Sequence, residues 1–516
     1  MERIYKGFIR YVALLMFTVI FFNVQAASTN EDVLLSLAGA EQSPTDFGAK
    51  GDGVTDDSEA FMKYLSYLKT TDTDVAYLSD RYIYNLGNKT IEIPKRIILK
   101  ITNSRIRNAI LKGNNTIIEA PPHLVFENVT LDGYFINTDQ VYVEWFGTFP
   151  NESNSVDLKE SLRSLNRVFF NVTLNQGTYY TKEGNIDLKS IKGQSQNMTF
   201  IELQSDTDGK HLFHIGKVGG SVAERTYEYN KLQSVGLVLS ANKKIYNNTL
   251  LIVGAAHKAD VKDVKFIMNS ENTSLTSAEL KKTAISGARS NLSNKAIAFN
   301  GASELISVHN VFTLSDVAVY FHTGADFITF SNLTTWCGKN GLASVYFKDS
   351  SVSNLLFTGA QSWSQGLYGV FAADGLTYNN FVNVKIENLR IEQLNTDVKS
   401  RDGSVLATSF WFGSYSHIPS LTFQNVMLAG TANGFRFGKL KDGVINLQNI
   451  NVFHDPKIKR AFAMKGEFQR EGYVSINLQN AYLAPDIPVA FVNAKRDSLP
   501  TMRANSFVNE KISTLR

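Results

Sequence analysis

Hydrophobic residues recur along most of the chain in short runs that alternate with polar residues, as they do in half-buried β-strands. From residue 232 onward, many of these runs share a small motif in which one residue, usually asparagine, stands between hydrophobic positions. The residue at this position is, in order, Asn310, Asn332, Gly359, Asn388, Asn425, Asn449 and Asn480. Successive positions lie 22 to 37 residues apart. A strand-rich unit repeated at this interval predicts a solenoid of stacked coils.

Asparagine at a fixed place in the repeat indicates a sharp corner between two strands. It tolerates the left-handed backbone of such a corner, and its side chain can bond its neighbours along the stack. A β-propeller is the alternative architecture, but its blades vary less in length than these repeats do. We therefore expect an all-β fold, a parallel β-helix, in which the longer coils between residues 359 and 425 form the loops of a groove.

Two helical patterns interrupt the strands in the N-terminal part of the chain. Hydrophobic residues at i, i+3, i+4 and i+7 predict a helix over residues 59–69, followed by strands near 75–78, 82–84, 90–93 and 97–101. A second such pattern predicts a helix over residues 157–165. Because Phe146-Gly147 precedes it as Phe47-Gly48 precedes the first, we interpret residues 141–165 as a degenerate copy of the opening module.

The opening module contains the sequence DFGAKGDGVTDDSEAF, residues 46–61. Its glycines permit a tight turn, and Asp56, Asp57 or Ser58 can cap the helix that follows. The alternative is that Asp56 and Asp57 form a catalytic or metal-binding carboxylate pair. The degenerate copy lacks the pair, so the module's architecture does not require it. We interpret the aspartates as residues that shape the turn and the helix start.

This stretch resembles the N-terminal signature of the pectate-lyase-type superfamily of right-handed parallel β-helix proteins. The superfamily includes secreted polysaccharide lyases, glycoside hydrolases and phage tail spikes. The resemblance implies a single-stranded right-handed β-helix, pectin-lyase-like, whose N-terminal end is closed by short capping helices. The resemblance implies the fold more strongly than the reaction, because one fold can host several reactions.

The first 26 residues have the features of a secretory signal peptide. A basic start precedes a hydrophobic run over residues 11–24 and a small-residue cleavage pattern at 24–26. The alternative is a membrane anchor, but the run is shorter than the ~20 residues that span a bilayer. We therefore expect a periplasmic or extracellular protein. The expected parts are 1–26, signal peptide; 27–140, capping module and first coils; 141–231, degenerate module and coils; 232–493, main β-helix; and 494–516, polar tail.

Composition excludes several classes of protein. The 516 residues have a net charge of +4, which does not indicate a nucleic-acid or membrane-surface ligand. Cys337 is the one cysteine, so the chain has no disulfide framework. The eight histidines show no metal-ligand spacing, and we expect neither a metal nor another cofactor. Related β-helices are often homotrimers, although no residue here specifies one.

Aromatic and charged residues suited to sugar binding gather between residues 336 and 417. Exposed aromatic rings stack on sugars, while charged and amide groups bind hydroxyls. The aromatic candidates for substrate binding are Trp336, Trp363, Tyr368, Trp411 and Tyr415. Each of them could instead fill a gap in the core.

Arg390 and Glu392 are the central catalytic candidates, since alternation places both on the outer face of one strand. A polysaccharide lyase needs a base and a positive group to neutralise a uronate. A glycoside hydrolase needs two carboxylates, and Asp374, Asp397 or Asp402 could supply the second. The alternative is an exposed ion pair without function. Asn395-Thr396-Asp397 matches one element of the polygalacturonase motif, but the remaining elements are missing, so we transfer none of its roles.

Two functions follow from these observations. The first is a secreted carbohydrate-active enzyme that cleaves a polysaccharide by hydrolysis or β-elimination in a groove on the β-helix. The second is a non-catalytic β-helix that binds or guides an exopolysaccharide during assembly or export.

Overall fold

The computed structural model divides the chain into two compact units. Unit 1 comprises the chain up to Pro121 together with Val125–Phe135, and unit 2 comprises Pro122–Leu124 and Ile136–Arg516. The structure describes residues 42–79, 81–268, 270–274, 276, 291–337, 341–364, 371–374, 379–393, 408–412, 416–429, 433–437, 439–453, 462–465, 467–468, 474–479, 482–483, 489–492, 501–504 and 512–513. The expected signal peptide therefore lies outside the described residues. Among the described residues, no helix is long and apolar enough to cross a membrane.

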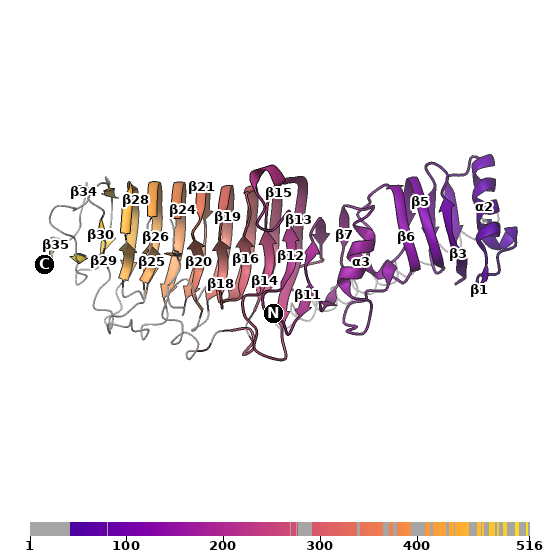
Figure 1. The fold of residues 1–516 in the computed structure, drawn as a ribbon, viewed down its shortest axis with the longest axis horizontal. Coiled ribbons are helices and arrows are strands. Elements are labelled where there is room, and N and C mark those ends of the chain that lie inside the picture. The colour runs from indigo at the N-terminus through magenta and orange to yellow at the C-terminus, as the bar shows by residue number, and fades with distance from the viewer. Residues whose placement is uncertain are drawn as a thin grey trace, which may run out of the picture. The chain divides into compact units, whose positions relative to one another are not determined.

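Unit 1 is a short stack of parallel strands with one helix against it (Figure 1). Its elements are η1 (Pro44–Phe47), β1 (Asp52–Asp56), α2 (Ser58–Thr70), β2 (Val75–Leu78), β3 (Ile83–Glu92), β4 (Ile98–Ile101), β5 (Arg105–Glu119) and β6 (Phe126–Phe135). The helix predicted over 59–69 is confirmed, because its hydrophobic face packs as the spacing requires. Phe61, Tyr64, Leu65 and Leu68 are all buried.

The two aspartates of the opening module hold its turn together. The Asp57 carboxylate, 2% exposed, accepts hydrogen bonds from the amides of Lys50 (2.6 Å) and Gly51 (3.1 Å). Asp57 occupies the N-cap position of α2 without a side-chain cap bond. Asp56 instead accepts from the Ser58 amide at 3.0 Å and pairs with Lys89 at 3.2 Å. These bonds confirm that the aspartates shape the turn and the helix start.

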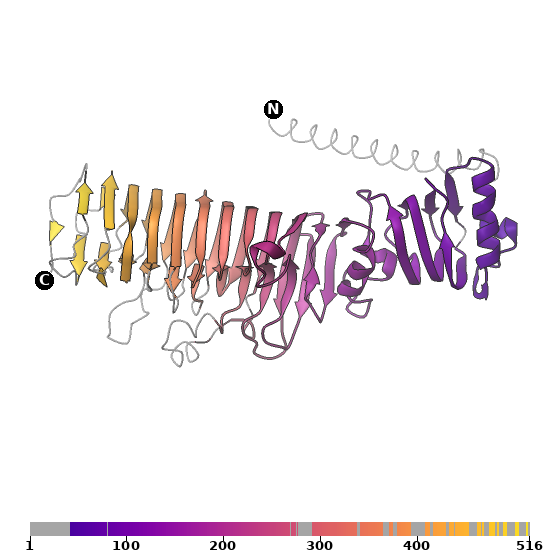
Figure 2. The same cartoon turned by 45° about the horizontal axis from the view of Figure 1, so that its top comes forward.

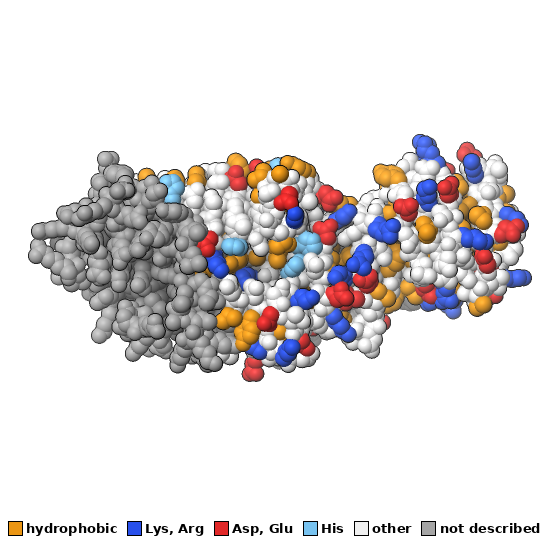
Figure 3. All heavy atoms as spheres, in the orientation of Figure 1, with side chains coloured by type: hydrophobic (Ala, Val, Ile, Leu, Met, Phe, Trp, Pro, Cys, Tyr) orange, Lys and Arg blue, Asp and Glu red, His pale blue; other side chains and the backbone are white. Residues whose placement is uncertain are grey.

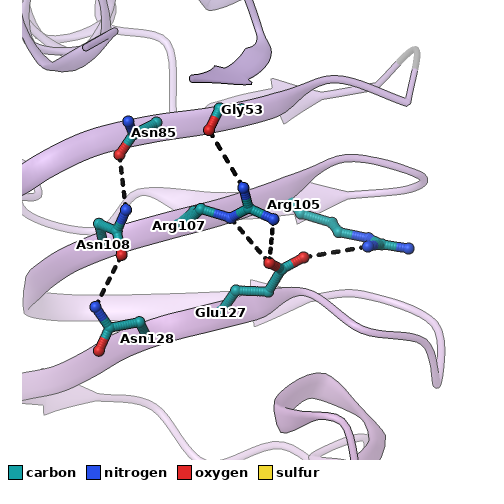
Figure 4. A network of polar contacts seen from close by, with 7 residues as sticks. All are labelled: Gly53, Asn85, Arg105, Arg107, Asn108, Glu127 and Asn128. Atoms are coloured by element: carbon teal, nitrogen blue, oxygen red, sulfur yellow. Dashed lines mark hydrogen bonds and ion pairs between the residues drawn. The ribbon is translucent and has the colours of Figure 1, made fainter. Parts of the chain in front are cut away.

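A polar network joins this turn to the coils beneath it (Figure 4). Arg107 donates to the Gly53 carbonyl at 3.3 Å and, through Nε, to the Glu127 carboxylate at 2.9 Å. Beside it, Asn128 donates to Asn108 at 2.8 Å and Asn108 to Asn85 at 3.0 Å. Both sets of contacts cross from coil to coil, so they fix the stacking of β3, β5 and β6.

Unit 2 begins with η2 (Val143–Phe146) and α3 (Leu158–Leu165), close to the helix predicted over 157–165. Asp157 caps α3 by accepting from the Lys159 amide at 2.9 Å. The 3-10 helix η2 ends at Gly147 with φ of 89°, and η1 ends at Gly48 with φ of 97°. The two modules therefore share a 3-10 helix, a left-handed glycine and a following α-helix.

The rest of unit 2 is a right-handed parallel β-helix built from two long sheets (Figures 1 and 2). The seventeen-stranded sheet contains β7 (Asn171–Thr173), β8 (Gly177–Thr181), β10 (Ser190–Lys192), β11 (Thr199–Gln204), β13 (Thr226–Ser240), β15 (Ala256–Ile267), β17 (Ser303–Ser315), β19 (Gly324–Cys337), β21 (Ser351–Thr358), β22 (Gln361–Ser364), β24 (Asn379–Gln393), β26 (Ser416–Ala429), β28 (Lys439–Phe453), β30 (Glu467–Phe468), β31 (Val474–Gln479), β32 (Tyr482–Leu483) and β34 (Thr501–Ala504).

The nine-stranded sheet contains β9 (Ile186–Asp187), β12 (His211–Ile215), β14 (Thr249–Val253), β16 (Lys295–Phe299), β18 (Val317–Phe321), β20 (Ala343–Lys348), β23 (Phe371–Asp374), β25 (Thr408–Phe412) and β27 (Asn433–Phe437). The remaining elements are η3 (Val222–Glu224) and a three-stranded sheet of β29 (Phe462–Lys465), β33 (Val489–Val492) and β35 (Ile512–Ser513). From β11 to β21, successive strands lie alternately in the two long sheets, so each of these coils contributes to both, which is the topology predicted from the repeats.

The predicted corner residues have left-handed backbones. Their φ values are 52° at Asn310, 52° at Asn332, 65° at Gly359, 55° at Asn388, 54° at Asn425 and 52° at Asn449, while Asn480 lies outside the described residues. Asn449 donates to Asn425 at 2.8 Å and Asn425 to Asn388 at 3.0 Å. The bend is confirmed at the six described positions, and the side-chain ladder is confirmed at Asn388, Asn425 and Asn449.

Inward side chains stack between the sheets into a continuous core. Phe299, Phe321 and Phe347 lie in three successive coils with ring centroids 4.7 Å apart at each step. Strands in neighbouring coils are separated by about 4.8 Å, so identical aromatic residues in register stack face to face. This stacking fixes the register that aligns residues on the outer surface.

Candidate functional site

Three of the predicted site residues occupy one column of the seventeen-stranded sheet. Trp336 of β19 is the register partner of Trp363 of β22, and Trp363 is the register partner of Glu392 of β24. The side chains of Trp336 and Glu392 are 39% and 26% exposed, so these two lie on the outer face. We call positions 336, 363 and 392 the tryptophan column. The fold thus aligns three residues from three successive coils.

Arg390 and Glu392 contact each other beside this column. An Nη2 group of Arg390 donates to Oε1 of Glu392, and their side chains are 53% and 26% exposed. The shared outer face follows from the two-residue period of a strand. An ion pair this exposed stabilises the fold by only about 0–1 kcal/mol. The pair therefore contributes little to stability.

The other predicted residues do not join the column. Asp374 ends β23 of the nine-stranded sheet, where its register partner is Lys348. Trp411 lies in β25 of the same sheet, in register with Ala372 and Arg436. Tyr368, Asp397, Asp402 and Tyr415 lie outside the described residues. Within the described part of the chain, the second carboxylate thus falls on a different sheet from Arg390 and Glu392.

A cluster of hydroxyl groups supports the tryptophan column from inside the core. The side-chain oxygen of Thr335 lies 2.9 Å from those of Ser344 and Ser362, which are 2.7 Å from each other. An internal cavity of about 20 Å³ borders the three residues, room for roughly one water molecule. Thr335 and Ser362 directly precede the two tryptophans, so this cluster fixes the backbone on which the tryptophans lie.

A second row of polar residues, which sequence reasoning missed, crosses the coils from β13 to β21. We call Tyr227, His257, Glu304, Asp326 and Ser353 the polar row. The Tyr227 and His257 rings lie 5.0 Å apart, and His257 Nδ1 lies 3.4 Å from Glu304 Oε2. Glu304 and Asp326 are register partners, and Asp326 Oδ1 accepts from the Ser353 hydroxyl at 2.8 Å.

Arg225 anchors the polar row at Glu304. Its Nη1 lies 2.5 Å from Glu304 Oε2, and its Nε donates to the Ala302 carbonyl at 2.7 Å. The repeat spacing could have revealed the row. Glu304 and Asp326 are separated by the same 22 residues that separate the corner residues Asn310 and Asn332.

Lys295 is a buried cation of the nine-stranded sheet. It is 3% exposed, and its Nζ donates to the Asn247 side chain at 2.7 Å and to the Ser293 carbonyl at 2.9 Å. Burial lowers the pKa of Lys295 to about 7, although the negative charge of Asp316 opposes the shift. Nothing among its described contacts gives it access to a polymer, so we interpret it as structural.

The surface shows no face of a single charge in the view of Figure 3, where basic and acidic side chains are interspersed over the described surface. In the described part of the chain, no group of three or more His, Cys, Asp or Glu residues could hold a metal ion.

Solved structures similar to this chain share its fold at low sequence identity. A tailspike of Acinetobacter phage vb_AbaP_AS12 is 11% identical with a TM-score of 0.41, over 71% of this chain and 62% of the tailspike chain. The catalytic unit of a GH87 α-1,3-glucanase from Streptomyces thermodiastaticus is 10% identical with a TM-score of 0.41, over 72% of this chain and 69% of that unit. The alignment thus spans less than two thirds of the tailspike chain.

No protein-family model matches the sequence, and no curated protein matches it. At this level of identity the similarity concerns the fold and not the chemistry.

Proposed function

We propose that the protein is a secreted carbohydrate-active enzyme that cleaves a glycosidic bond of a polysaccharide at the tryptophan column. The observation that supports the proposal is the register of Trp336, Trp363 and Glu392 in three successive coils. An exposed aromatic ring offers an apolar face to a sugar ring. A linear polymer lying along the β-helix would meet this face beside a carboxylate and a guanidinium.

Glu392 and Arg390 can serve either of two reactions. In β-elimination, Glu392 removes the C5 proton of a uronate, whose carboxylate Arg390 neutralises. The electron pair released forms the C4–C5 double bond, and the leaving glycosidic oxygen takes up a proton. In hydrolysis, Glu392 acts with a second carboxylate, for which Asp374, Asp397 and Asp402 are the candidates.

The alternative is a non-catalytic β-helix that binds or guides an exopolysaccharide. One observation favours it: Asp374 lies in the nine-stranded sheet and Glu392 in the seventeen-stranded sheet. A hydrolase needs its two carboxylates within about 5–9.5 Å of each other. Elimination does not need the second carboxylate, so the placement of Asp374 argues against hydrolysis more strongly than against elimination.

Incubation with a panel of acidic and neutral polysaccharides tests the proposal. New reducing ends indicate cleavage, and ultraviolet absorbance of an unsaturated uronate identifies elimination. We expect reducing ends from at least one polymer. Binding without either product across the whole panel would refute the enzyme and favour the alternative.

A further inference from the structure

Two exposed hydrophobic residues occupy corner positions that normally favour asparagine or glycine. Leu305 has φ of 56° and is 44% exposed, and Phe327 has φ of 50° and is 49% exposed. A left-handed backbone is unfavourable for a residue with a Cβ unless its short polar side chain compensates. Because both side chains are exposed, they also gain no stabilisation from burial. Neither conformational preference nor core packing therefore explains them.

In the next two coils, the same corner position is occupied by asparagine. Asn354 and Asn383 have φ of 51° and 53° and follow Phe327 in register, because the residues on either side of each pair are partners. Asn383 donates to Asn354 at 2.8 Å, and Asn354 donates to Asp326 at 2.9 Å. Asparagine therefore fits this corner and bonds along it, which leaves the hydrophobic pair in need of another explanation.

The hydrophobic pair borders the polar row. Leu305 directly follows Glu304, and Phe327 directly follows Asp326. Tyr227, at the other end of the row, is 74% exposed. Exposed rings next to fixed hydrogen-bonding groups match the two sides of a sugar, which presents apolar C–H faces and polar hydroxyls.

Both carboxylates of the row are held through one oxygen only. Glu304 contacts Arg225 and His257 through Oε2. Asp326 accepts from the Ser353 hydroxyl, the Asn354 amide group and the Phe327 backbone amide, all through Oδ1. Among the described residues, Oε1 of Glu304 and Oδ2 of Asp326 have no donor. The fold thus fixes two carboxylates in adjacent strands and leaves one acceptor oxygen on each.

We propose that the polar row, with Leu305 and Phe327, is a second glycan-binding site, separate from the tryptophan column, for a chain of neutral or amino-bearing sugars. The two acceptor oxygens bind sugar hydroxyls or an ammonium group, and Phe327 and Tyr227 stack on sugar faces. Arg225 balances the charge of Glu304, whereas neutral donors hold Asp326, so the negative charge of Asp326 disfavours a uronate. The inference rests on the proposed function only in that both assign the protein a carbohydrate ligand.

The two sites lie on different stretches of the same strands. In β19, Asp326 of the polar row and Trp336 of the tryptophan column are separated by the bend at Asn332. A glycan bound along the polar row therefore runs over another face of the β-helix. Variants at one site can test it without altering the other.

A glycan array with neutral, amino-bearing and uronate oligosaccharides tests the proposal. We expect wild-type protein to bind at least one neutral or amino-bearing glycan. Phe327→Asn should bind it about tenfold more weakly, yet melt at an equal or higher temperature, because asparagine suits the left-handed corner. A merely structural role for Phe327 would lower both together. Tyr134→Asn, which replaces a 64% exposed aromatic residue of unit 1, is the matched control and should bind as wild type.

The proposal is overturned if wild-type protein binds uronate glycans alone or no glycan on the array, or if Phe327→Asn binds as wild type does. Measuring polymer cleavage by the wild type, Phe327→Asn and Glu392→Gln separates failure of the second site from failure of the proposed enzyme. Loss of cleavage in Glu392→Gln with normal binding in Phe327→Asn would refute only the second site. Weak binding in Phe327→Asn without cleavage by any protein would refute only the enzyme.

Discussion

Glu304 and Asp326 stand side by side in β17 and β19, each fixed through one carboxylate oxygen while the other has no donor among the described residues. The pair arises because a β-helix brings residues one coil apart into register. Their surroundings differ: Arg225 holds Glu304, whereas neutral donors hold Asp326. Asp326 is therefore the better residue for testing how negative charge contributes to binding.

Asp326→Asn should weaken binding of an amino-bearing glycan by about tenfold and of a neutral glycan by less. A hydrogen bond between ionised groups is about twice as strong as one between neutral groups. Titration calorimetry with matched glucosamine and glucose oligomers measures the two losses. Equal losses for both oligomers would show that the charge of Asp326 does not select the sugar.

Asp57→Ala should lower the free energy of unfolding by about 1–3 kcal/mol, because the buried amide of Gly51 and the part-buried amide of Lys50 lose their acceptor. Polysaccharide cleavage per folded molecule should stay unchanged, since the aspartate shapes a turn in unit 1. Urea unfolding gives the first quantity and reducing-end release at low temperature the second. A loss of activity with normal stability would instead support the catalytic interpretation of the aspartate pair.

Asn425→Ala should destabilise the β-helix by about 1–2 kcal/mol or more, since alanine in a left-handed backbone is strained and both ladder bonds are lost. Asn425→Gly should cost less, because glycine removes the bonds without the strain. Thermal unfolding followed by circular dichroism ranks the three proteins. Equal melting temperatures for the alanine and glycine variants would contradict the role assigned to the corner.

Lys295 should make stability depend on pH. Burial lowers its pKa to about 7 in the folded protein from 10.5 in the unfolded chain. Between these values the unfolded chain binds a proton that the folded protein lacks, so the free energy of unfolding rises as pH increases from 7. Below pH 7 both states are protonated, and the cost of burying the charge is constant.

The size of this rise approaches about 1.4 kcal/mol per pH unit inside the window. Lys295→Met removes the titrating group, so the variant should lack this rise in the free energy of unfolding with pH. Subtracting its urea-derived stability from that of the wild type, pH by pH, isolates the lysine from other groups. Parallel curves for the two proteins between pH 7 and 10 would show that Lys295 stays charged when folded.

The periodic features of the fold could be predicted from the sequence because they repeat. Asparagine and glycine at the corners revealed the coils, since few other residues adopt a left-handed backbone easily. The helices α2 and α3 could be located because their hydrophobic residues recur with the period of a helix. Alternation within β24 placed Arg390 and Glu392 on one face, and coil-to-coil register then added Trp336 and Trp363.

Relationships without such periodicity could not be predicted. Asp374 is only 16 residues before Arg390, but it ends a strand of the other sheet. Sequence separation does not reveal where a coil passes between sheets. Asp57 looked like a helix cap, but its carboxylate binds amides of the preceding loop. The polar row joins residues from five coils whose lengths differ, and their alignment emerges only from the strand register.

Cleavage by Glu392→Gln is the most direct test of the proposed function. Beside it on β24, Glu387 pairs with Lys385 at 2.5 Å, on the other side of the Asn388 corner. Glu387→Gln is thus a matched control that removes the carboxylate of a similar ion pair on the same strand.

The measurement is the initial rate of reducing-end release from the polymer that the wild-type protein cleaves. We predict that Glu392→Gln and Arg390→Ala each lower this rate by at least ~10²-fold, while Glu387→Gln keeps it near the wild-type value. Near-normal rates for Glu392→Gln, or an equal loss in Glu387→Gln, would contradict catalysis at the tryptophan column.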